Sequence, residues 1–285
     1  MLNNKLGKSP ESGIFSSILF DMVRPKKHLG QHFLTDQGIA HRITELIRYG
    51  KENTVIEIGP GKGILTSFLL SMDLKELILV EIDRESVIYL KENYGNGNFR
   101  IIEGDFLKTV IPDSMKGISI IGNFPYNISS QIFFRVLELK DRVQEVVCMV
   151  QKEVAQRILS PPGNKQYGIL SVLLQTWFDI SLAFHVRPGS FFPPPAVNSS
   201  VIRLERNGRT GMTCSEDLYA RVIKSGFNQR RKVLSNSLSS ILLHLGSESD
   251  RLGLRRRPEE LSVEDFISLS TEIEKLQYQS KNLRT

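Results

Sequence analysis

The four residues Asn123, Phe124, Pro125 and Tyr126 combine groups that can act on an amine. They follow an apolar run that ends at Ile121 and has the composition of a β-strand. The side-chain oxygen of Asn123 and a neighbouring backbone carbonyl, which we assign to Phe124, can accept both N–H groups of an exocyclic amine. Pro125 stiffens this backbone, and Tyr126 offers a face on which a base can stack. Taken alone, the motif is explained equally well as an aromatic-proline turn that caps a strand.

Three further features lie at the ends of the preceding strand-like runs. Residues 57–63, EIGPGKG, form a loop in which Gly59 and Gly61 permit a tight turn and the close approach of a ligand. Glu81 ends the second predicted strand, where a carboxylate can accept both hydroxyls of a ribose. Asp105 follows the third and can accept the amino group of an adenine. Ligands of open α/β sheets bind at these carboxyl ends, so we expect all of these features to share one site.

The glycine loop has the spacing G-x-G-x-G. Because the next residue is Ile64, the loop lacks the third glycine of the dinucleotide pattern G-x-G-x-x-G. On its own such a loop is as consistent with a structural turn as with a nucleotide site. Together with Glu81, Asp105 and the preceding acid Glu57, which can orient the loop, it predicts S-adenosylmethionine rather than NAD. The sulfonium of this methyl donor is an excellent electrophile, so we expect alignment for in-line transfer to matter more than a strong general base.

The elements that position these residues alternate between strands and helices. The run over 143–150 is almost continuously apolar, as expected for a strand buried on both faces. The alternation predicts a Rossmann-like α/β fold with a parallel, doubly wound sheet, the class I fold of S-adenosylmethionine-dependent methyltransferases. The predicted strands are 54–58, 77–82, 99–103, 117–121, 143–150 and an antiparallel pair at 180–186 and 199–204; the predicted helices are one capped by Asp36 that runs to about Tyr49, followed by 64–71, 84–93 and 129–139.

The chain divides into three predicted parts. Residues 1–21 contain no Arg and carry Glu11 and Asp21, so they are a poor secretory signal and a poor transit peptide, and we expect a disordered extension. Residues 22–205 hold the predicted methyltransferase domain. Residues 206–285 open with a linker and predict a small α-helical domain, with helices over 216–227, 231–245 and 263–276.

Composition narrows the classes of protein further. The 285 residues carry a formal net charge of +6, which is informative only where the charge clusters. No apolar run approaches the roughly 20 residues of a membrane-spanning helix, so we expect no membrane partner and a cytoplasmic location. Cys148 and Cys214 lie far apart, and the five histidines form no H-x-H or H-x-x-x-H pair, so we expect no metal site.

With these residues in place, the sequence resembles the ribosomal RNA adenine N6,N6-dimethyltransferase family. The resemblance implies dimethylation, by S-adenosylmethionine, of the N6 amine of two adjacent adenosines in the 3′-terminal hairpin loop of small-subunit (16S) rRNA during ribosome biogenesis. It further implies a monomer that acts on rRNA within a pre-ribosomal 30S particle. The segments that carry the resemblance are KHLGQHFL (27–34), EIGPGKG (57–63), VEID (80–83), GNFPYNIS (122–129), MVQKEVAQRI (149–158), FFPPPAVNSSV (191–201) and FNQRRK (227–232).

The resemblance also assigns roles to matching positions. His32 stands where the family usually has Asn, in a segment that covers the cofactor, and a histidine can still donate or accept one hydrogen bond. Phe191 resembles the second aromatic wall of the base site, although ordinary core packing explains it equally well. The implied cofactor contacts are His32, Leu34, Gly59, Gly61, Glu81, Asp105 and Asn123, the catalytic residues are Asn123, Phe124 and Tyr126, and the residues that hold the target base are Tyr126 and Phe191.

A basic run over residues 221–232, RVIKSGFNQRRK, contains no acid. A solvated helix face is a common cause of such a run. The family, however, uses this region on the RNA side of its cleft, at what we expect to be the start of the second C-terminal helix. The tribasic segment 255–257 is explained equally well as a further RNA contact or as a soluble loop. The expected RNA contacts are Lys27, Arg221, Lys224, Asn228, Arg230, Arg231 and Lys232.

Three alternative functions stay open at this point. A large-subunit rRNA adenine methylase shares the fold, the donor and an NFPY-like motif, but FNQRRK and QKE favour the small-subunit enzyme. A DNA adenine methylase usually carries a separate target-recognition domain, for which this chain has no room. An RNA-binding assembly factor without catalytic function is disfavoured by the intact Gly59, Glu81 and Asn123.

Overall fold

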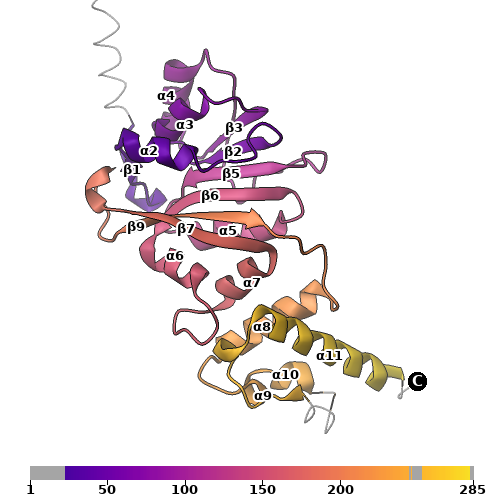
Figure 1. Ribbon diagram of the computed structural model, residues 1–285. Coiled ribbons are helices and arrows are strands. Elements are labelled where there is room, and N and C mark those ends of the chain that lie inside the picture. The colour runs from indigo at the N-terminus through magenta and orange to yellow at the C-terminus, as the bar shows by residue number, and fades with distance from the viewer. Residues whose placement is uncertain (1–22, 244, 246–251, 283–285) are drawn as a thin grey trace, which may run out of the picture.

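One large β-sheet forms the main body of the protein. The computed structural model describes residues 23–243, 245 and 252–282, and the predicted extension over 1–21 lies outside them. The strands of the sheet are β2 (Thr54–Ile58), β3 (Glu76–Glu81), β4 (Arg100–Glu103), β5 (Ile118–Asn123), β6 (Val143–Gln151), β7 (Phe178–Val186) and β9 (Ser199–Arg206). Their order is β4-β3-β2-β5-β6-β9-β7 (Figure 1). The first five are parallel, and β9 pairs antiparallel with both β6 and β7, which confirms the predicted sheet and its antiparallel pair.

Helices cover both faces of the sheet (Figure 1). One face carries α2 (Gln37–Thr44), α3 (Ile64–Leu69) and α4 (Arg84–Tyr94), and the other carries α5 (Ser129–Glu138), α6 (Lys152–Leu159) and α7 (Ile169–Trp177). Alternate residues of each buried strand serve the two faces, because side chains in a strand alternate with a period of two. Val55 packs in the core under α2–α4, whereas its neighbour Ile56 packs in the core under α5–α7.

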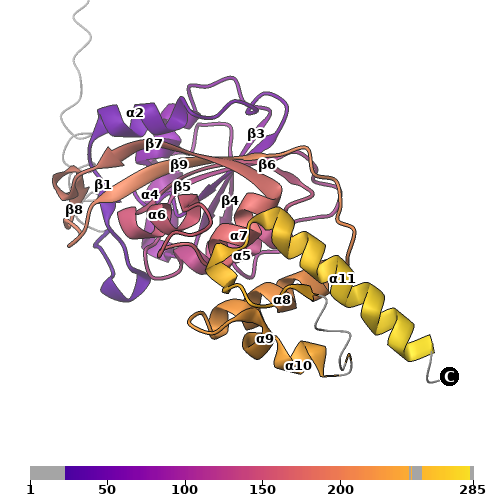
Figure 2. The ribbon, with the colours of Figure 1, turned by 60° about the horizontal axis from the view of Figure 1, so that its bottom comes forward.

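The C-terminal helices form a third core. They are α8 (Glu216–Asn228), α9 (Leu234–Ser237), α10 (Ser239–Leu242) and α11 (Val263–Asn282), with the short turn η4 (Pro258–Glu260) before the last of them. Helix α7 joins this core to the sheet, because Leu170 and Leu174 pack under the sheet while Val172 and Leu173 pack against the C-terminal helices (Figure 2). None of the described helices has the length and apolar character needed to cross a lipid bilayer.

The first helix is shorter than the sequence predicts. Helix α2 ends at Thr44 rather than near Tyr49, so the predicted end is wrong. The backbone N–H groups of Arg48 and Tyr49 donate instead to the carboxylate of Glu145 on β6, at 3.1 and 2.9 Å. A buried carboxylate needs such donors, and it takes them from residues that would otherwise continue the helix.

The predicted helix over 231–245 is also wrong. Residues 229–233 form a turn after α8, and two four-residue helices, α9 and α10, follow it. The N–H groups of Leu234 and Ser235 donate to the carbonyls of Arg256 and Leu254, at 2.9 and 3.1 Å, so tertiary hydrogen bonds replace helical ones. Elements that were not predicted from the sequence are α6, α7 and a two-stranded ribbon of β1 (Phe33–Leu34) and β8 (Phe191–Phe192), which lies beside the short turns η1 (Lys27–Leu29) and η2 (Pro188–Ser190).

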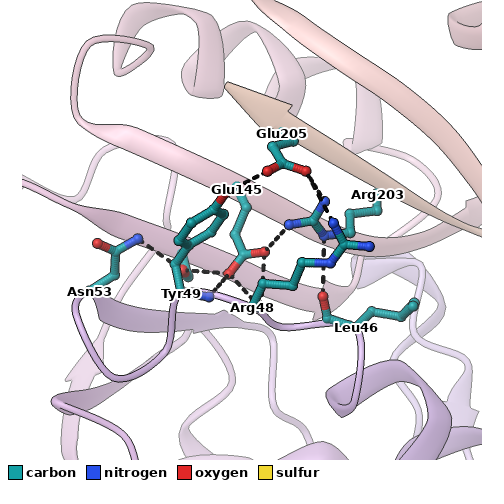
Figure 3. A network of polar contacts seen from close by, with 8 residues as sticks. Leu46, Arg48, Tyr49, Asn53, Glu145, Arg203 and Glu205 are labelled. Carbon is teal, nitrogen blue, oxygen red and sulfur yellow. Dashed lines mark hydrogen bonds and ion pairs between the residues drawn. The ribbon is translucent and has the colours of Figure 1, made fainter. Parts of the chain in front are cut away.

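A buried polar network joins β6, β9 and the segment after α2 (Figure 3). Glu145 is fully buried and pairs with the guanidinium of Arg203 at 2.8 Å. It also accepts the hydroxyl of Ser119 at 2.9 Å. Arg203 forms a second ion pair with Glu205, whose carboxylate accepts the hydroxyl of Tyr49 at 2.5 Å. The two acids and the arginine therefore satisfy one another where β6 and β9 pair.

Candidate active site

A cavity of about 240 Å³ opens at the carboxyl ends of β2, β3, β4 and β5. Parallel strands bring the residues that follow them to one edge of the sheet, as expected from the sequence. The N-terminal strap, which we define as residues 26–34, closes another side of the cavity. Of the residues predicted to bind the cofactor or to act on the base, the lining includes His32, Gly59, Gly61, Glu81, Asp105, Asn123, Phe124 and Tyr126.

Two predicted residues lie elsewhere. Leu34 is buried in the core under α2–α4 and lines a separate hollow of about 30 Å³ together with Gly59 and Asn123. Phe191 is 4% exposed and packs in the same core as Leu34. The sequence left two explanations open for Phe191, and its burial in the structure agrees with core packing. The exposed aromatic residue of this segment is Phe192.

The glycine loop has a backbone that other residues adopt with strain. Gly59 and Gly61 have φ angles of +64° and +56°, in the left-handed region that favours glycine. A Cβ atom on Gly61 would lie 2.7 Å from the ring of Phe33, whereas a Cβ atom on Gly59 would meet nothing within 4 Å. The loop thus packs tightly against the strap at Gly61 and faces open space at Gly59.

Glu81 is a buried acceptor at the base of the cavity. Its carboxylate accepts the N–H groups of Gly61 at 3.0 Å and of Asp83 at 2.8 Å, one on each oxygen. Burial raises the pKa of Glu81, and these two backbone donors oppose that shift. Each carboxylate oxygen has a second lone pair, so Glu81 can still accept hydroxyl groups from a ligand.

Glu57 lies in the strand next to Glu81 and is fully buried. Its carboxyl accepts the hydroxyl of Thr66 on α3 at 2.7 Å, and this bond ties the end of β2 to the helix that follows the loop. Burial raises the pKa of Glu57 to about 8, and the charge of Glu81 adds to the shift. Glu57 is therefore a neutral hydrogen-bonding group at neutral pH.

An apolar slot lies beside Asp105. One carboxylate oxygen of Asp105 accepts the N–H of Leu107 at 2.9 Å, which fixes the side chain at the cavity wall. Ile82 is 52% exposed and lines the cavity with Phe106 and Leu107. These three apolar residues were not predicted from the sequence. Their place in the sequence could have identified them, because each closely follows a strand-terminal acid. Ligand sites combine apolar walls with a few polar groups.

Asn123 lines the cavity and has one side-chain acceptor that is not used within the described residues. Its Nδ2 donates to the backbone carbonyl of His32 at 2.8 Å. Because a carbonyl can only accept, this contact orients the amide and leaves Oδ1 on the other side. Oδ1 is buried and has no hydrogen-bond partner among the described residues. Such an acceptor is rare in a folded protein, and a ligand or an ordered water can supply the missing donor.

Tyr126 is held on two sides. Its hydroxyl lies 2.5 Å from Oγ of Ser199, and its ring stacks on His32 with centroids 5.4 Å apart and an interplanar angle of 28°. Burial raises the pKa of Tyr126, so the phenol stays protonated at neutral pH. His32 in turn lies with Nδ1 2.8 Å from the carbonyl of Pro193, which requires the proton on Nδ1.

Phe124 contributes its backbone to the site rather than its ring. Its N–H donates to the carbonyl of Met149 on β6 at 3.0 Å. The ring is 1% exposed and packs edge-on against Phe133, with centroids 5.8 Å apart. The carbonyl that we predicted as an acceptor thus belongs to a backbone anchored at both the sheet and the core.

The strap is anchored near both of its ends. At one end, Lys26 forms an ion pair with the buried Asp83, at 2.5 Å, in the loop after β3. Near its middle, the carbonyl of His28 accepts the side chain of Asn127 at 3.3 Å. At the other end, β1 pairs antiparallel with β8. The strap is therefore part of the cavity wall.

The predicted RNA-binding residues fall into two groups. Lys27 is exposed on the strap, whereas the others lie on α8 and in the turn after it, so the expected position at the start of a second helix is wrong. The side chain of Arg230 bonds to other residues of the protein. Its guanidinium donates to the carbonyl of Asn164 at 3.1 Å and lies 3.8 Å from the carboxylate of Glu259. The exposed members of the C-terminal group are Arg221, Lys224, Asn228, Arg231 and Lys232.

The tribasic segment 255–257 lies beside this turn. The backbone bonds from Leu234 and Ser235 place residues 254–256 next to the residues that follow Lys232. Arg255 and Arg257 are exposed, so basic residues from two parts of the chain gather on one region of the C-terminal helices. Among the described residues, no group of three or more His, Cys, Asp or Glu side chains is arranged to hold a metal ion.

Comparisons with known proteins agree with this geometry. The family model for ribosomal RNA adenine dimethylase matches residues 22–275. The ribosomal RNA small subunit methyltransferase A of Porphyromonas gingivalis is 49% identical over 251 residues, which cover 87% of this chain and 97% of the relative. The protein of the same description from Parabacteroides distasonis is 48% identical over 253 residues, with 87% and 94% covered.

Solved structures support the same assignment. A dimethyladenosine transferase from Plasmodium falciparum superposes with a TM-score of 0.76 at 25% identity, covering 86% of this chain and 98% of that one. The 23S rRNA methyltransferase ErmE has a TM-score of 0.63 at 24% identity, with 85% and 99% covered, and shares the fold. The predicted class I methyltransferase fold is confirmed, and the chain belongs to the ribosomal RNA adenine dimethylase family.

Proposed function

We propose that this protein uses S-adenosylmethionine to dimethylate the N6 amines of two adjacent adenosines in the 3′-terminal hairpin loop of small-subunit (16S) rRNA. The observation that carries the proposal is the buried Oδ1 of Asn123, which lacks a partner among the described residues and belongs to a residue that lines the cavity at the strand ends. An adenine amine is a donor of the kind that this oxygen needs. The relatives from Porphyromonas and Parabacteroides are both described as small subunit methyltransferases.

The residues of the cavity fit the cofactor. Gly59 leaves open space where any other residue would place a Cβ atom, and Glu81 keeps lone pairs for the two ribose hydroxyls. Asp105 would accept the adenine amino group, and Ile82 would supply an apolar wall for the purine. The strap contributes His32, with Leu34 behind the glycine loop. When bound, S-adenosylmethionine supplies an activated methyl group.

The chain's own residues position the target amine. An amine conjugated to a purine is a weak nucleophile, because its lone pair is delocalised into the ring. Oδ1 of Asn123 and the carbonyl of Phe124 accept its two N–H groups and favour a more tetrahedral nitrogen, while Tyr126 stacks on the base. Since the side-chain amide of Asn123 is already oriented by His32, little reorganisation is needed when the base arrives.

The RNA must deliver an unstacked base to this cavity, as for other enzymes that act on a nucleobase. A loop in folded rRNA meets that need most easily. The exposed basic residues on α8 and in the following turn supply phosphate contacts on one side, and Lys27 supplies one on the strap. We further propose that the protein acts as a monomer on rRNA within a pre-ribosomal 30S particle, in the cytoplasm.

The test is mass spectrometry of the 3′ region of small-subunit rRNA from cells with and without this protein. N6,N6-dimethyladenosine is expected only in cells that contain it, and an unchanged spectrum contradicts the proposal. A large-subunit methylase would instead change primer extension on large-subunit rRNA, and an assembly factor would change neither.

The catalytic assignment is tested with Asn123→Ala. Transfer of labelled methyl groups to undermethylated small subunits should fall on the order of 100-fold, as when one preorganised hydrogen-bonding group is removed from an active site. The control is Asn93→Ala, because Asn93 is exposed on α4 and its side chain donates, within the described part of the chain, to the carbonyl of Tyr89 in its own helix. Equal rates for Asn123→Ala and the wild type would rule out the mechanism.

A further inference from the structure

Phe192 is a large apolar side chain that the fold holds in solvent. It is 62% exposed, although its neighbour Phe191 is 4% exposed. Both belong to β8, which pairs antiparallel with β1 so that Phe192 lies opposite Phe33 and Phe191 lies opposite Leu34. Single exposed apolar residues are common on proteins, so exposure alone assigns no role to Phe192.

The register of the ribbon decides where Phe192 lies. Successive side chains of a strand point to opposite faces, and residues directly opposite each other share a face with Cβ atoms about 5 Å apart. Leu34 and Phe191 are both buried in the core under α2–α4. Phe33 and Phe192 therefore share the other face. Phe33 lines the cavity and Phe192 does not, so the register puts Phe192 just outside the lining, a position that we call the rim.

The backbone around Phe192 is fixed on both sides. Before it, the carbonyl of Ser190 accepts the N–H of Thr35 at 2.8 Å. After it, the carbonyl of Pro193 lies 2.8 Å from Nδ1 of His32, whose ring stacks on Tyr126. An exposed aromatic ring on a rigid backbone loses little conformational entropy when a flat partner stacks on it.

The surroundings favour a nucleic-acid base as that partner. Nζ of Lys62 lies 5.7 Å from the ring centroid of Phe33, the cross-strand partner of Phe192, and Lys27 is exposed on the strap. Aromatic rings next to cationic side chains are typical of sites for single-stranded nucleic acids, where every base has a face to stack.

We propose that Phe192 is a stacking subsite for an unpaired nucleobase next to the adenine held by Asn123 and Tyr126. This inference rests on the proposed function and deepens it. When the target nucleotide leaves its stack, its neighbour loses a stacking partner, and Phe192 replaces that partner at the cavity rim. For two adjacent target adenosines, the subsite holds the one that is not in the cavity.

The test compares Phe192→Ala and Phe192→Tyr with the wild type in methylation assays on undermethylated small subunits. Loss of one base–aromatic stack weakens binding about 5- to 150-fold. Phe192→Ala should therefore raise the KM for the RNA substrate by that factor and leave kcat and the KM for S-adenosylmethionine unchanged. Phe192→Tyr should restore the wild-type KM. The control is Leu182→Ala, because Leu182 is also exposed, at 44%, but lies on the edge strand β7.

A direct readout is 2-aminopurine placed beside the target adenosine in an rRNA fragment. Its fluorescence should be quenched on binding to the wild type and to Phe192→Tyr, and to a smaller extent with Phe192→Ala. An unchanged KM and unchanged quenching with Phe192→Ala would overturn the subsite. Failure of the wild type to methylate the RNA would instead overturn the proposed function itself, so the two failures are distinguishable.

Discussion

Two buried acids, Glu57 and Glu81, lie in adjacent strands beneath the glycine loop. Glu81 receives the N–H groups of Gly61 and Asp83, and Glu57 receives hydrogen bonds from both the hydroxyl and the backbone of Thr66. Burial raises the pKa of both carboxyls, and hydrogen bonds to each of them oppose that shift. A neutral Glu57 adds no negative charge next to Glu81.

Replacement of Glu57 by Gln tests this assignment. The pKa of Glu57 is raised from 4.5 to about 8 in the folded protein. Between these values the unfolded chain releases a proton that the folded chain keeps, so stability falls as pH rises, by at most about 1.4 kcal/mol per pH unit. Glu57→Gln keeps an acceptor for Thr66 and does not titrate, so its stability relative to the wild type should increase with pH.

The measurement is urea unfolding of both proteins at several values from about pH 5 to about pH 8. The control is Glu52→Gln, because Glu52 is an exposed acid in the same part of the chain. Parallel stability profiles for Glu57→Gln and the wild type would show that Glu57 is ionised in the folded protein.

At the scale of elements, the network around Glu145 connects β6 and β9 to the segment that follows α2, which lies about 100 residues or more before them in the sequence. Arg203 and Glu145 are 58 residues apart in sequence, and Tyr49 is 156 residues from Glu205. Removal of one partner of a buried ion pair leaves the other charge uncompensated. The antiparallel pairing of β6 and β9 therefore depends on a complete network (Figure 3).

Glu145→Gln should lower the free energy of unfolding by about 3–5 kcal/mol, because it leaves the charge of Arg203 buried with one acid fewer. The double variant Glu145→Gln with Arg203→Met should be destabilised by less than the sum of the two single variants, since the groups interact directly. Urea unfolding of the wild type, the two single variants and the double variant gives the coupling free energy between Glu145 and Arg203. Lys51→Ala, which breaks the exposed pair with Asp73 at 2.8 Å, should change stability by less than about 1 kcal/mol. Additive effects of the two substitutions would contradict the network.

The strands could be predicted because their apolar runs are local and long. The predicted strand over 54–58 and the observed β2 coincide, and the residues after each strand meet at one cavity because parallel strands end at one edge. The end of α2 could not be predicted, because its cause is Glu145, about 100 residues further along the chain. The same holds for the contact of His32 with Pro193, 161 residues away, which fixes the stacking partner of Tyr126.

At the scale of the whole molecule, helix α7 links the sheet to the C-terminal helices through two faces (Figure 2). Its apolar residues run almost without interruption, so their division between two cores carries no periodic signal in the sequence. A buried hydrogen bond of 2.7 Å between Thr176 and Tyr219 adds a polar contact between α7 and α8. The boundary that we predict at residues 205 and 206 thus separates regions that α7 joins by packing.

The basic turn after α8 gives a prediction for RNA binding by the whole protein. The double variant Arg231→Ala with Lys232→Ala should weaken binding of small-subunit rRNA. It should also reduce the slope of log affinity against log salt by about 0.7–0.9 for each phosphate that the variant no longer neutralises. Affinity for S-adenosylmethionine should not change, because the turn lies outside the cavity lining.

Fluorescence anisotropy between about 50 and 200 mM salt measures this slope. The control is Lys275→Ala, which removes an exposed lysine of α11 that pairs with Glu272 at 2.7 Å. A slope equal to that of the wild type would show that Arg231 and Lys232 do not contact phosphates.

The unpartnered oxygen of Asn123 also bears on where the proposed reaction stops. An unmodified adenine amine carries two hydrogens, its monomethylated form carries one, and the dimethylated form carries none. The finished product therefore has nothing to donate to Oδ1, and the buried acceptor again lacks a donor from the base. An unsatisfied buried acceptor costs about 1–3 kcal/mol, so the doubly methylated base is held more weakly than either precursor. The hydrogen bond to Asn123 therefore depends on the hydrogens left on the amine. The second methyl transfer removes the last of them and so promotes release of the dimethylated base.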